Sequence, residues 1–167
     1  LITVTGTIDV ANAITVTGAD VLLEDVEFRD SAATSQFDDF LIIGTGAARC
    51  KVVRPVIRSH ASGDAAESGI LISAAVDGVE IHDANIDGLF ATGCIESTAA
   101  ATNTVIKDAM VRNRHATQDC GINLHASNTG FILSPRVRSA TNDADGFNLA
   151  IVAAAAQVYD PLVVNLN

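Results

Sequence analysis

The stretch "IHDANI" at residues 81–86 contains a tetrad, DANI, whose pattern recurs along the chain. The tetrad has Asp, Arg or Ser in first place, Ala, Val or Pro in second place, and a bulky apolar residue in fourth place. Its six copies, 25 to 29 residues apart, are Asp25–Phe28, Arg54–Ile57, Asp83–Ile86, Asp108–Val111, Ser134–Val137 and Asp160–Val163. All three prolines of the chain occupy the second place: Pro55, Pro135 and Pro161. Because proline has no N–H to donate, this place is predicted to be one structural position, a corner or a strand start.

A second series of apolar tetrads has the same period and is offset by about half a repeat. Its members are Ala13–Val16, Asp39–Ile42, Gly69–Ile72, Gly93–Glu96, Gly121–Leu124 and Gly146–Leu149. Each repeat is therefore expected to hold a short strand opened by this series, a turn, a second strand, a corner, and a third strand that ends the first tetrad.

Short strands with no room for helices between them can bury their side chains only if each repeat stacks on the next. This predicts a parallel β-solenoid of about six coils, with neighbouring coils about 4.8 Å apart. Stacking predicts two inward columns of side chains. They are Ile14, Phe40, Ile70, Cys94, Ile122, Phe147 and, in the other column, Phe28, Ile57, Ile86, Val111, Val137, Val163. An antiparallel sandwich is the alternative, but it gives no reason for every proline to be in phase.

The composition limits the class of protein. The chain of 167 residues is 49% hydrophobic but only 4% aromatic, which suits thin layers of small and β-branched side chains. We expect one domain over residues 1–167, belonging to a longer protein since the chain starts at Leu1. A formal charge of −10 argues against nucleic-acid binding. No apolar run is long enough to span a bilayer, and the three cysteines form no metal-binding motif, so neither membrane insertion nor a metal or other cofactor is expected.

The repeat length and strand pattern resemble the right-handed parallel β-helix family, over almost the whole chain. That family includes pectate lyases, polysaccharide-cleaving phage tailspikes and other virion proteins. The resemblance implies an all-β, single-stranded, right-handed parallel β-helix. Because the coils are acidic and carry few decorations, the chain looks more like the viral structural branch than like a secreted lyase, and many members of that branch associate around a threefold axis.

Charges also form columns in a solenoid. The residues directly after the tetrads are Arg29, Arg58, Asp87, Arg112, Arg138 and Val164. One interpretation is a surface salt ladder in which Asp87 lies between two arginines. The other is an arginine stripe, Arg58, Arg112 and Arg138, that binds carboxylate or sulfate groups of a polysaccharide or of a partner surface. In the first place of the tetrad, Arg54 is expected to bridge Asp25 and Asp83.

The loops between repeats contain the candidate catalytic groups. If the chain is a glycoside hydrolase, Asp119 with Asp143 or Asp145 is the best carboxylate pair, and His115 lies near it in sequence. These residue types are also ordinary in turns. The calcium-binding acids that pectate lyases carry on one strand column are absent from the corresponding outward positions, so the lyase pattern is missing.

An apolar strip is predicted on the outside of the solenoid. Strand alternation places Leu41, Leu71 and Ile95 outward on successive coils, next to Ile43. An apolar strip of this kind is expected to be buried by another part of the structure, either a neighbouring subunit or the loop "SAATSQF". The same alternation points Glu96 inward, which indicates either a shift of register at Cys94–Ile95 or a buried polar network or ion.

Together these observations favour a non-enzymatic structural module of a phage or other virus particle. The expected partners are two further copies in a homotrimer, other virion proteins, and possible surface polysaccharide. Its expected role is to stabilise or decorate the virion surface. The alternatives are a tailspike-type polysaccharide hydrolase and a carbohydrate-binding module. Both suffer from the lack of Trp and the single Tyr, because aromatic rings stack on sugars.

Overall fold

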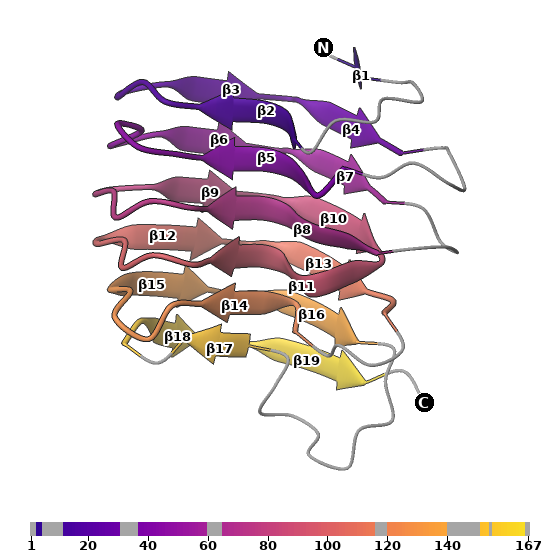
Figure 1. Ribbon diagram of the computed structural model, residues 1–167. Helices are drawn as coiled ribbons and strands as arrows, with labels where there is room; N and C mark the ends of the chain where they lie inside the picture. The colour runs from indigo at the N-terminus through magenta and orange to yellow at the C-terminus, as the bar shows by residue number, and fades with distance from the viewer. Residues whose placement is uncertain are drawn as a thin grey trace.

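The computed structural model shows a stack of parallel strands that wind around one core (Figure 1). It describes residues 3–4, 12–30, 37–59, 65–115, 120–139, 151–153 and 155–165. In this part of the chain every regular element is a β-strand, and neighbouring strands in each sheet are parallel. No helix there is long and apolar enough to cross a membrane. The predicted parallel β-solenoid is confirmed, with about five turns.

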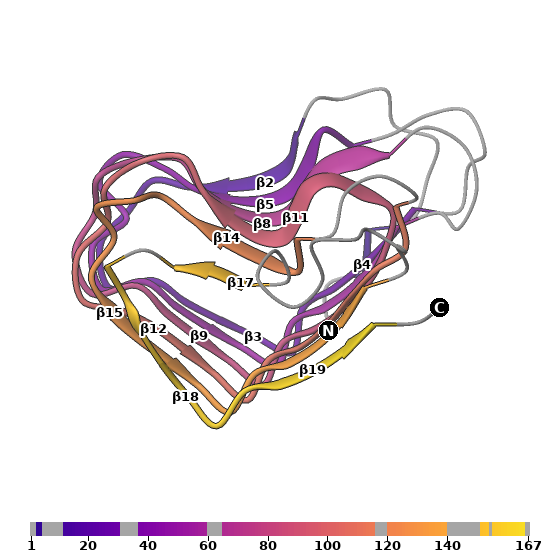
Figure 2. The same cartoon turned by 90° about the horizontal axis from the view of Figure 1, so that it is seen from below.

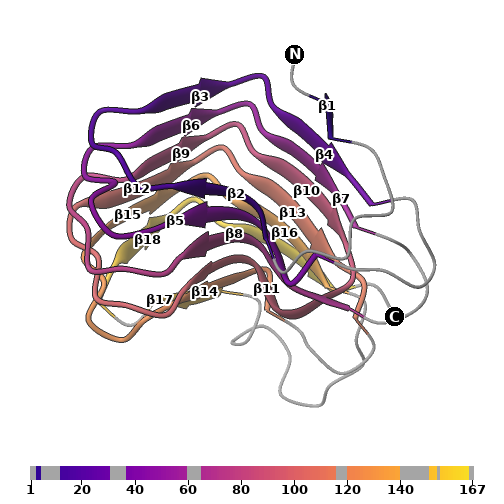
Figure 3. The ribbon, with the colours of Figure 1, turned by 45° about the horizontal axis from the view of Figure 1, so that its top comes forward.

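Three sheets surround the core, and each turn of the chain contributes one strand to each sheet (Figures 2 and 3). Sheet A consists of β1 (Thr3–Val4), β4 (Glu27–Arg29), β7 (Val56–Arg58), β10 (Asn85–Gly88), β13 (Met110–Asn113), β16 (Arg136–Ser139) and β19 (Leu162–Asn165). Sheet B consists of β2 (Asn12–Val16), β5 (Asp39–Ile43), β8 (Ala66–Ile72), β11 (Phe90–Ser97), β14 (Ile122–Leu124) and β17 (Ile151–Ala153). Sheet C consists of β3 (Leu22–Glu24), β6 (Lys51–Val53), β9 (Glu80–His82), β12 (Thr104–Lys107), β15 (Gly130–Leu133) and β18 (Gln157–Tyr159).

The recurring tetrad forms the corner between sheet C and sheet A. Its first residue has a left-handed backbone in every copy, with φ between 47° and 54°: Asp25, Arg54, Asp83, Asp108, Ser134 and Asp160. The backbone N–H of Arg54 donates to His82 O, and that of Val56 donates to Val26 O. The second residue of the tetrad lies between these two donors, so proline is tolerated there. The prediction that this place is a corner is confirmed.

The inward column of sheet A also follows the prediction. The fourth residues of the tetrads are in register from β4 to β19: Phe28, Ile57, Ile86, Val111, Val137 and Val163. The first five of these have at most 1% of their surface exposed. The regular step from corner to strand therefore fixes which side chains enter the core from this sheet.

In sheet B the predicted column is wrong by one residue in two strands. The residues in register with Ile70 are Leu41 and Ile95, whereas the prediction placed Phe40 and Cys94 there. The rest of the predicted column fits at Ile14 and Ile122, and Phe147 lies outside the described residues.

The difference arises because two consecutive residues face the core. Both Phe40 and Leu41 are fully buried, as are both Cys94 and Ile95. The Phe40 ring contacts Phe28 of sheet A at 6.4 Å between centroids, and it contacts Phe90 at 6.3 Å. The strands leave strict alternation here to accommodate these rings, and β11 shifts its register between Phe90 and Gly93.

Candidate functional site

The outer face of sheet A presents two rows of side chains, one on either side of the buried tetrad anchor. The third place of the tetrad supplies Glu27, Val56, Asn85, Met110, Arg136 and Leu162. The position after the tetrad supplies Arg29, Arg58, Asp87, Arg112, Arg138 and Val164. The second row was predicted as a column, and its register is confirmed. The first row follows from the same tetrad, because side chains alternate along a strand.

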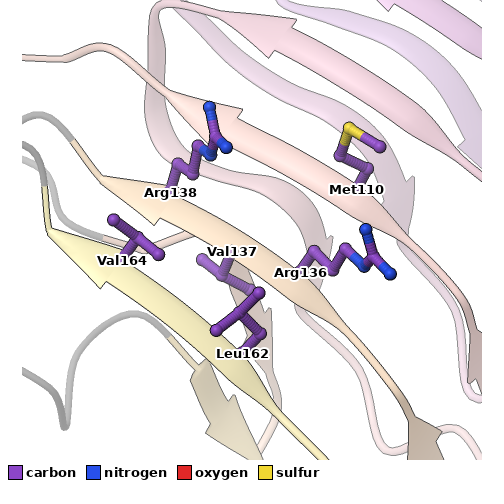
Figure 4. A pocket seen from close by; sticks show the side chains of 6 residues that line it. All are labelled: Met110, Arg136, Val137, Arg138, Leu162 and Val164. Atoms are coloured by element: carbon purple, nitrogen blue, oxygen red, sulfur yellow. The ribbon is translucent and has the colours of Figure 1, made fainter.

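A groove crosses the lower part of this face (Figure 4). Its lining residues come from β13, β16 and β19: Met110, Arg136, Val137, Arg138, Leu162 and Val164. A second hollow adjoins it, shares Met110 and Arg138, and extends to Arg112 and Asp87. Met110 is 49% exposed and Leu162 is 55% exposed, so the groove combines accessible apolar surface with guanidinium groups.

Most basic side chains of the described residues outside this groove have a carboxylate partner. The ion pairs are Arg49–Asp20 at 2.6 Å, Lys51–Glu80 at 2.7 Å, Arg54–Asp25 at 2.7 Å, Arg54–Glu24 at 2.8 Å, Arg114–Asp87 at 2.5 Å, Lys107–Asp108 at 3.8 Å, and Arg29–Glu27. Arg58 instead donates to two backbone carbonyls, those of Ile57 and Asn85.

Three adjacent arginines differ from the others. Among the residues that the structure describes, Arg112, Arg136 and Arg138 have no carboxylate within 4.0 Å, and they also lack the backbone acceptors that Arg58 has. The Nε atom of Arg112 is buried and has no hydrogen-bond acceptor there. Arg112 and Arg138 are directly paired on neighbouring strands, and like charges placed opposite each other destabilise a sheet. This surface thus offers three guanidinium groups to an anionic partner.

The predicted salt ladder, in which Asp87 pairs with the arginines on either side of it in the column, does not form. Asp87 does lie in register between Arg58 and Arg112, but its carboxylate pairs with Arg114, just beyond β13. The reason is geometric, because the Arg114 guanidinium reaches both carboxylate oxygens of Asp87, at 2.5 and 2.6 Å. Nothing in the sequence pattern singles out Arg114.

At the corner, the prediction for Arg54 is half right. Its guanidinium binds Asp25 of the preceding coil. Its second partner is Glu24, which lies next to Asp25, instead of Asp83 of the following coil. The hydrogen bond from Arg54 lowers the pKa of the Asp25 carboxyl. These groups are exposed, so this is a local cluster of surface ion pairs.

The predicted apolar strip on sheet B is largely wrong. Leu41, Ile43 and Ile95 are 0% exposed and lie in the core, since the strands place two consecutive residues inward at Phe40–Leu41 and Cys94–Ile95. Leu71 alone keeps its outward, partly exposed position. Its neighbours in register are Ile42 and Glu96, so Glu96 lies on the outside and the shift of register explains its position.

The outer face of sheet B is acidic. Its strands, where described, contain Asp39, Glu67 and Glu96 and no Lys or Arg. Burial raises the pKa of Glu96, and the charges of Asp39 and Glu67 raise it further, against a hydrogen bond from Thr92 at 2.6 Å. Burial likewise raises the pKa of Asp39, opposed by a hydrogen bond from Ser68. In the described part of the chain, no Lys or Arg forms an ion pair with these carboxylates.

Of the four candidate catalytic residues, the structure describes His115. Asp119, Asp143 and Asp145 lie outside the described residues. His115 follows β13, where its backbone N–H donates to the side-chain oxygen of Asn113 at 3.0 Å. Within the described ranges, no three His, Cys, Asp or Glu side chains are grouped so that they could hold a metal ion. The hydrolase interpretation remains a prediction.

Comparison with known proteins gives no relatives. No family model, no curated protein and no solved structure matches the chain. What the chain shares with the β-helix family is a parallel β-solenoid built from a repeat.

Proposed function

We propose that this chain is a non-enzymatic structural module of a virus particle, a β-solenoid rod that associates with copies of itself, as a homotrimer, and with other virion proteins. In this role it stabilises or decorates the surface of the particle. The observation that carries the proposal is the outer face of sheet A. There, exposed Met110 and Leu162 lie beside Arg136 and Arg138 on a continuous sheet.

This surface has the composition of an interface more than that of an ordinary solvated face. Methionine and arginine are enriched in protein interfaces, where apolar area is buried and guanidinium groups bind carboxylates. Beneath them, β13 and β16 pair with a parallel strand on each side, and the edge strand β19 pairs with β16. A surface held in this way loses little conformational entropy when a partner binds.

Light scattering tests the proposal by measuring the mass in solution over a range of dilutions. The wild-type chain of 17.3 kDa is expected to give three times its monomer mass, and the Met110→Asp/Leu162→Asp double variant is expected to give the monomer mass. Leu22→Asp is the matched control, because Leu22 is 57% exposed on β3 in sheet C and its replacement should leave the mass unchanged. A wild-type monomer at all concentrations would overturn the proposal.

A further inference from the structure

Two faces of the rod carry opposite charge. The strands of sheet A hold five of the ten basic residues of the chain: Arg29, Arg58, Arg112, Arg136 and Arg138. They hold two acids, Glu27 and Asp87, and both are engaged by arginines. The described strands of sheet B hold acids and no bases. In a chain with a net charge of −10, this separation concentrates positive charge on one face.

Both faces have charges that the described part of the chain leaves without an opposite partner. On sheet A these are the guanidinium groups of Arg112, Arg136 and Arg138, and the buried Nε of Arg112 lacks an acceptor. On sheet B they are the carboxylates of Glu67 and Glu96. Each set stands among charges of its own sign, so pairing the two sets would relieve repulsion on both faces.

On each of the two faces, apolar side chains lie among the charged ones. Met110 and Leu162 lie among the arginines of sheet A, and the partly exposed Leu71 lies beside Glu96 on sheet B. Contact between the faces would cover these side chains together with the charges. Partly exposed apolar residues surrounded by complementary charges are the usual anatomy of a protein interface.

We propose that the outer face of sheet A of one copy packs against the outer face of sheet B of a second copy, with Arg112, Arg136 and Arg138 opposite Glu67 and Glu96. This inference rests on the self-association proposed above and names its surfaces. A second copy fits better than an unrelated ligand because two identical rods share one coil spacing, about 4.8 Å. Acids on two successive coils of one copy, Glu67 on β8 and Glu96 on β11, can therefore meet arginines on two successive coils of the other, Arg112 on β13 and Arg138 on β16.

The contact is heterologous, since it joins two different surfaces. A pair of copies leaves one face of each kind free, sheet B on one copy and sheet A on the other, so the assembly closes as a ring or continues as an open array according to the rotation between neighbours. Because the two faces differ, the charge of each can be reversed separately. Neither variant should then associate with itself, and a mixture of the two tests whether the faces bind each other.

The experiment reverses the charge of one face at a time. The first variant, Arg112→Glu/Arg138→Glu, has two acidic faces, and the second, Glu67→Arg/Glu96→Arg, has two basic faces. Each alone is expected to fall to the mass of a single chain in light scattering. An equal mixture is expected to associate again, with both variants in the complex, because the acidic face of one meets the basic face of the other. Recovery in the mixture also shows that both variants are folded.

A matched control has the same change in net charge on another face. Lys51→Glu/Lys107→Glu alters sheet C, and it should associate as the wild type does. If the wild type associates but either reversal variant still does so alone, or the mixture stays monomeric, the face-to-face contact is overturned while self-association stands. If the wild type itself is monomeric, both proposals fail.

Discussion

The Arg114 guanidinium donates two hydrogen bonds to the Asp87 carboxylate, from Nε to Oδ1 at 2.5 Å and from Nη2 to Oδ2 at 2.6 Å. Asp87 lies in a column between Arg58 and Arg112, yet it pairs with a residue two places beyond that column. Because Arg114 occupies both oxygens, Arg112 keeps no ion pair with Asp87, and the groove of sheet A retains a positive charge.

Replacing Asp87 tests the energetic role of this pair. Asp87→Ala should lower the free energy of unfolding by about 1 kcal/mol, the loss of a partly exposed bidentate pair. It also leaves Arg58 and Arg112 with no acid between them. Urea unfolding measures the change, and Asp38→Ala, at an exposed acid just before β5, is the control. An equal effect of the two substitutions would contradict the assigned role of the pair.

The corner position predicts a preference for residues that tolerate a left-handed backbone. Asp108 has a φ of 52°, and its ion pair with Lys107 is long at 3.8 Å. Asp108→Val should lower the stability by about 1–2 kcal/mol, because a β-branched side chain clashes in this conformation. Asp108→Gly should change it by less than about 0.5 kcal/mol, as relief of strain offsets the greater flexibility of the unfolded chain. Equal stability of the two variants would argue against the corner geometry.

Gly130 opens β15 at a close approach between coils. It has a φ of 131°, and a Cβ atom there would lie 1.9 Å from the carbonyl oxygen of Thr104. Gly130→Ala should therefore destabilise the fold by about 2 kcal/mol or more, since backbone cannot move aside cheaply. At Gly18 an added Cβ would make an ordinary contact with Val21 at 3.5 Å, so Gly18→Ala is the control. In thermal unfolding, the melting temperature of Gly130→Ala should lie clearly below that of Gly18→Ala.

The buried carboxyl of Asp39 predicts a dependence of stability on pH. Burial raises its folded pKa above the usual value of 3.8, so the folded state binds the proton more tightly than the unfolded chain. Its effect is therefore to lower stability as the pH rises from about 3.8 through the folded pKa. Asp39→Asn keeps an acceptor for Ser68 and removes this slope. The melting temperature of the variant, relative to wild type, should be higher at pH 7 than at pH 4; a constant difference would contradict the raised pKa.

The cysteines should differ in reactivity. Burial raises the pKa of Cys50 to about 11, and it raises that of the fully buried Cys94. At pH 8 both thiols should resist alkylation in the folded protein and react after unfolding in urea. Cys120 is partly exposed and should react first. Mass spectrometry of the labelled peptides measures the order, and rapid labelling of Cys50 in the folded protein would contradict its burial.

The sequence alone determined the repeat, the corner and the inward column of sheet A. These features depend on local rules: proline needs a place without an N–H, and side chains alternate along a strand from the corner to residues such as Ile57 and Ile86. For the same reason the outward arginine row was predictable.

Only the tertiary structure decided the register of sheet B and the partners of the charges. The rings of Phe40 and Phe90 pack against each other across coils, and their size makes the strands place two consecutive residues inward. That contact joins residues far apart in sequence, so no local alternation contains it, and it moves Leu41 and Ile95 into the core. The choice of Arg114 by Asp87 likewise depends on the reach of a long side chain in space, which spacing along the chain does not specify.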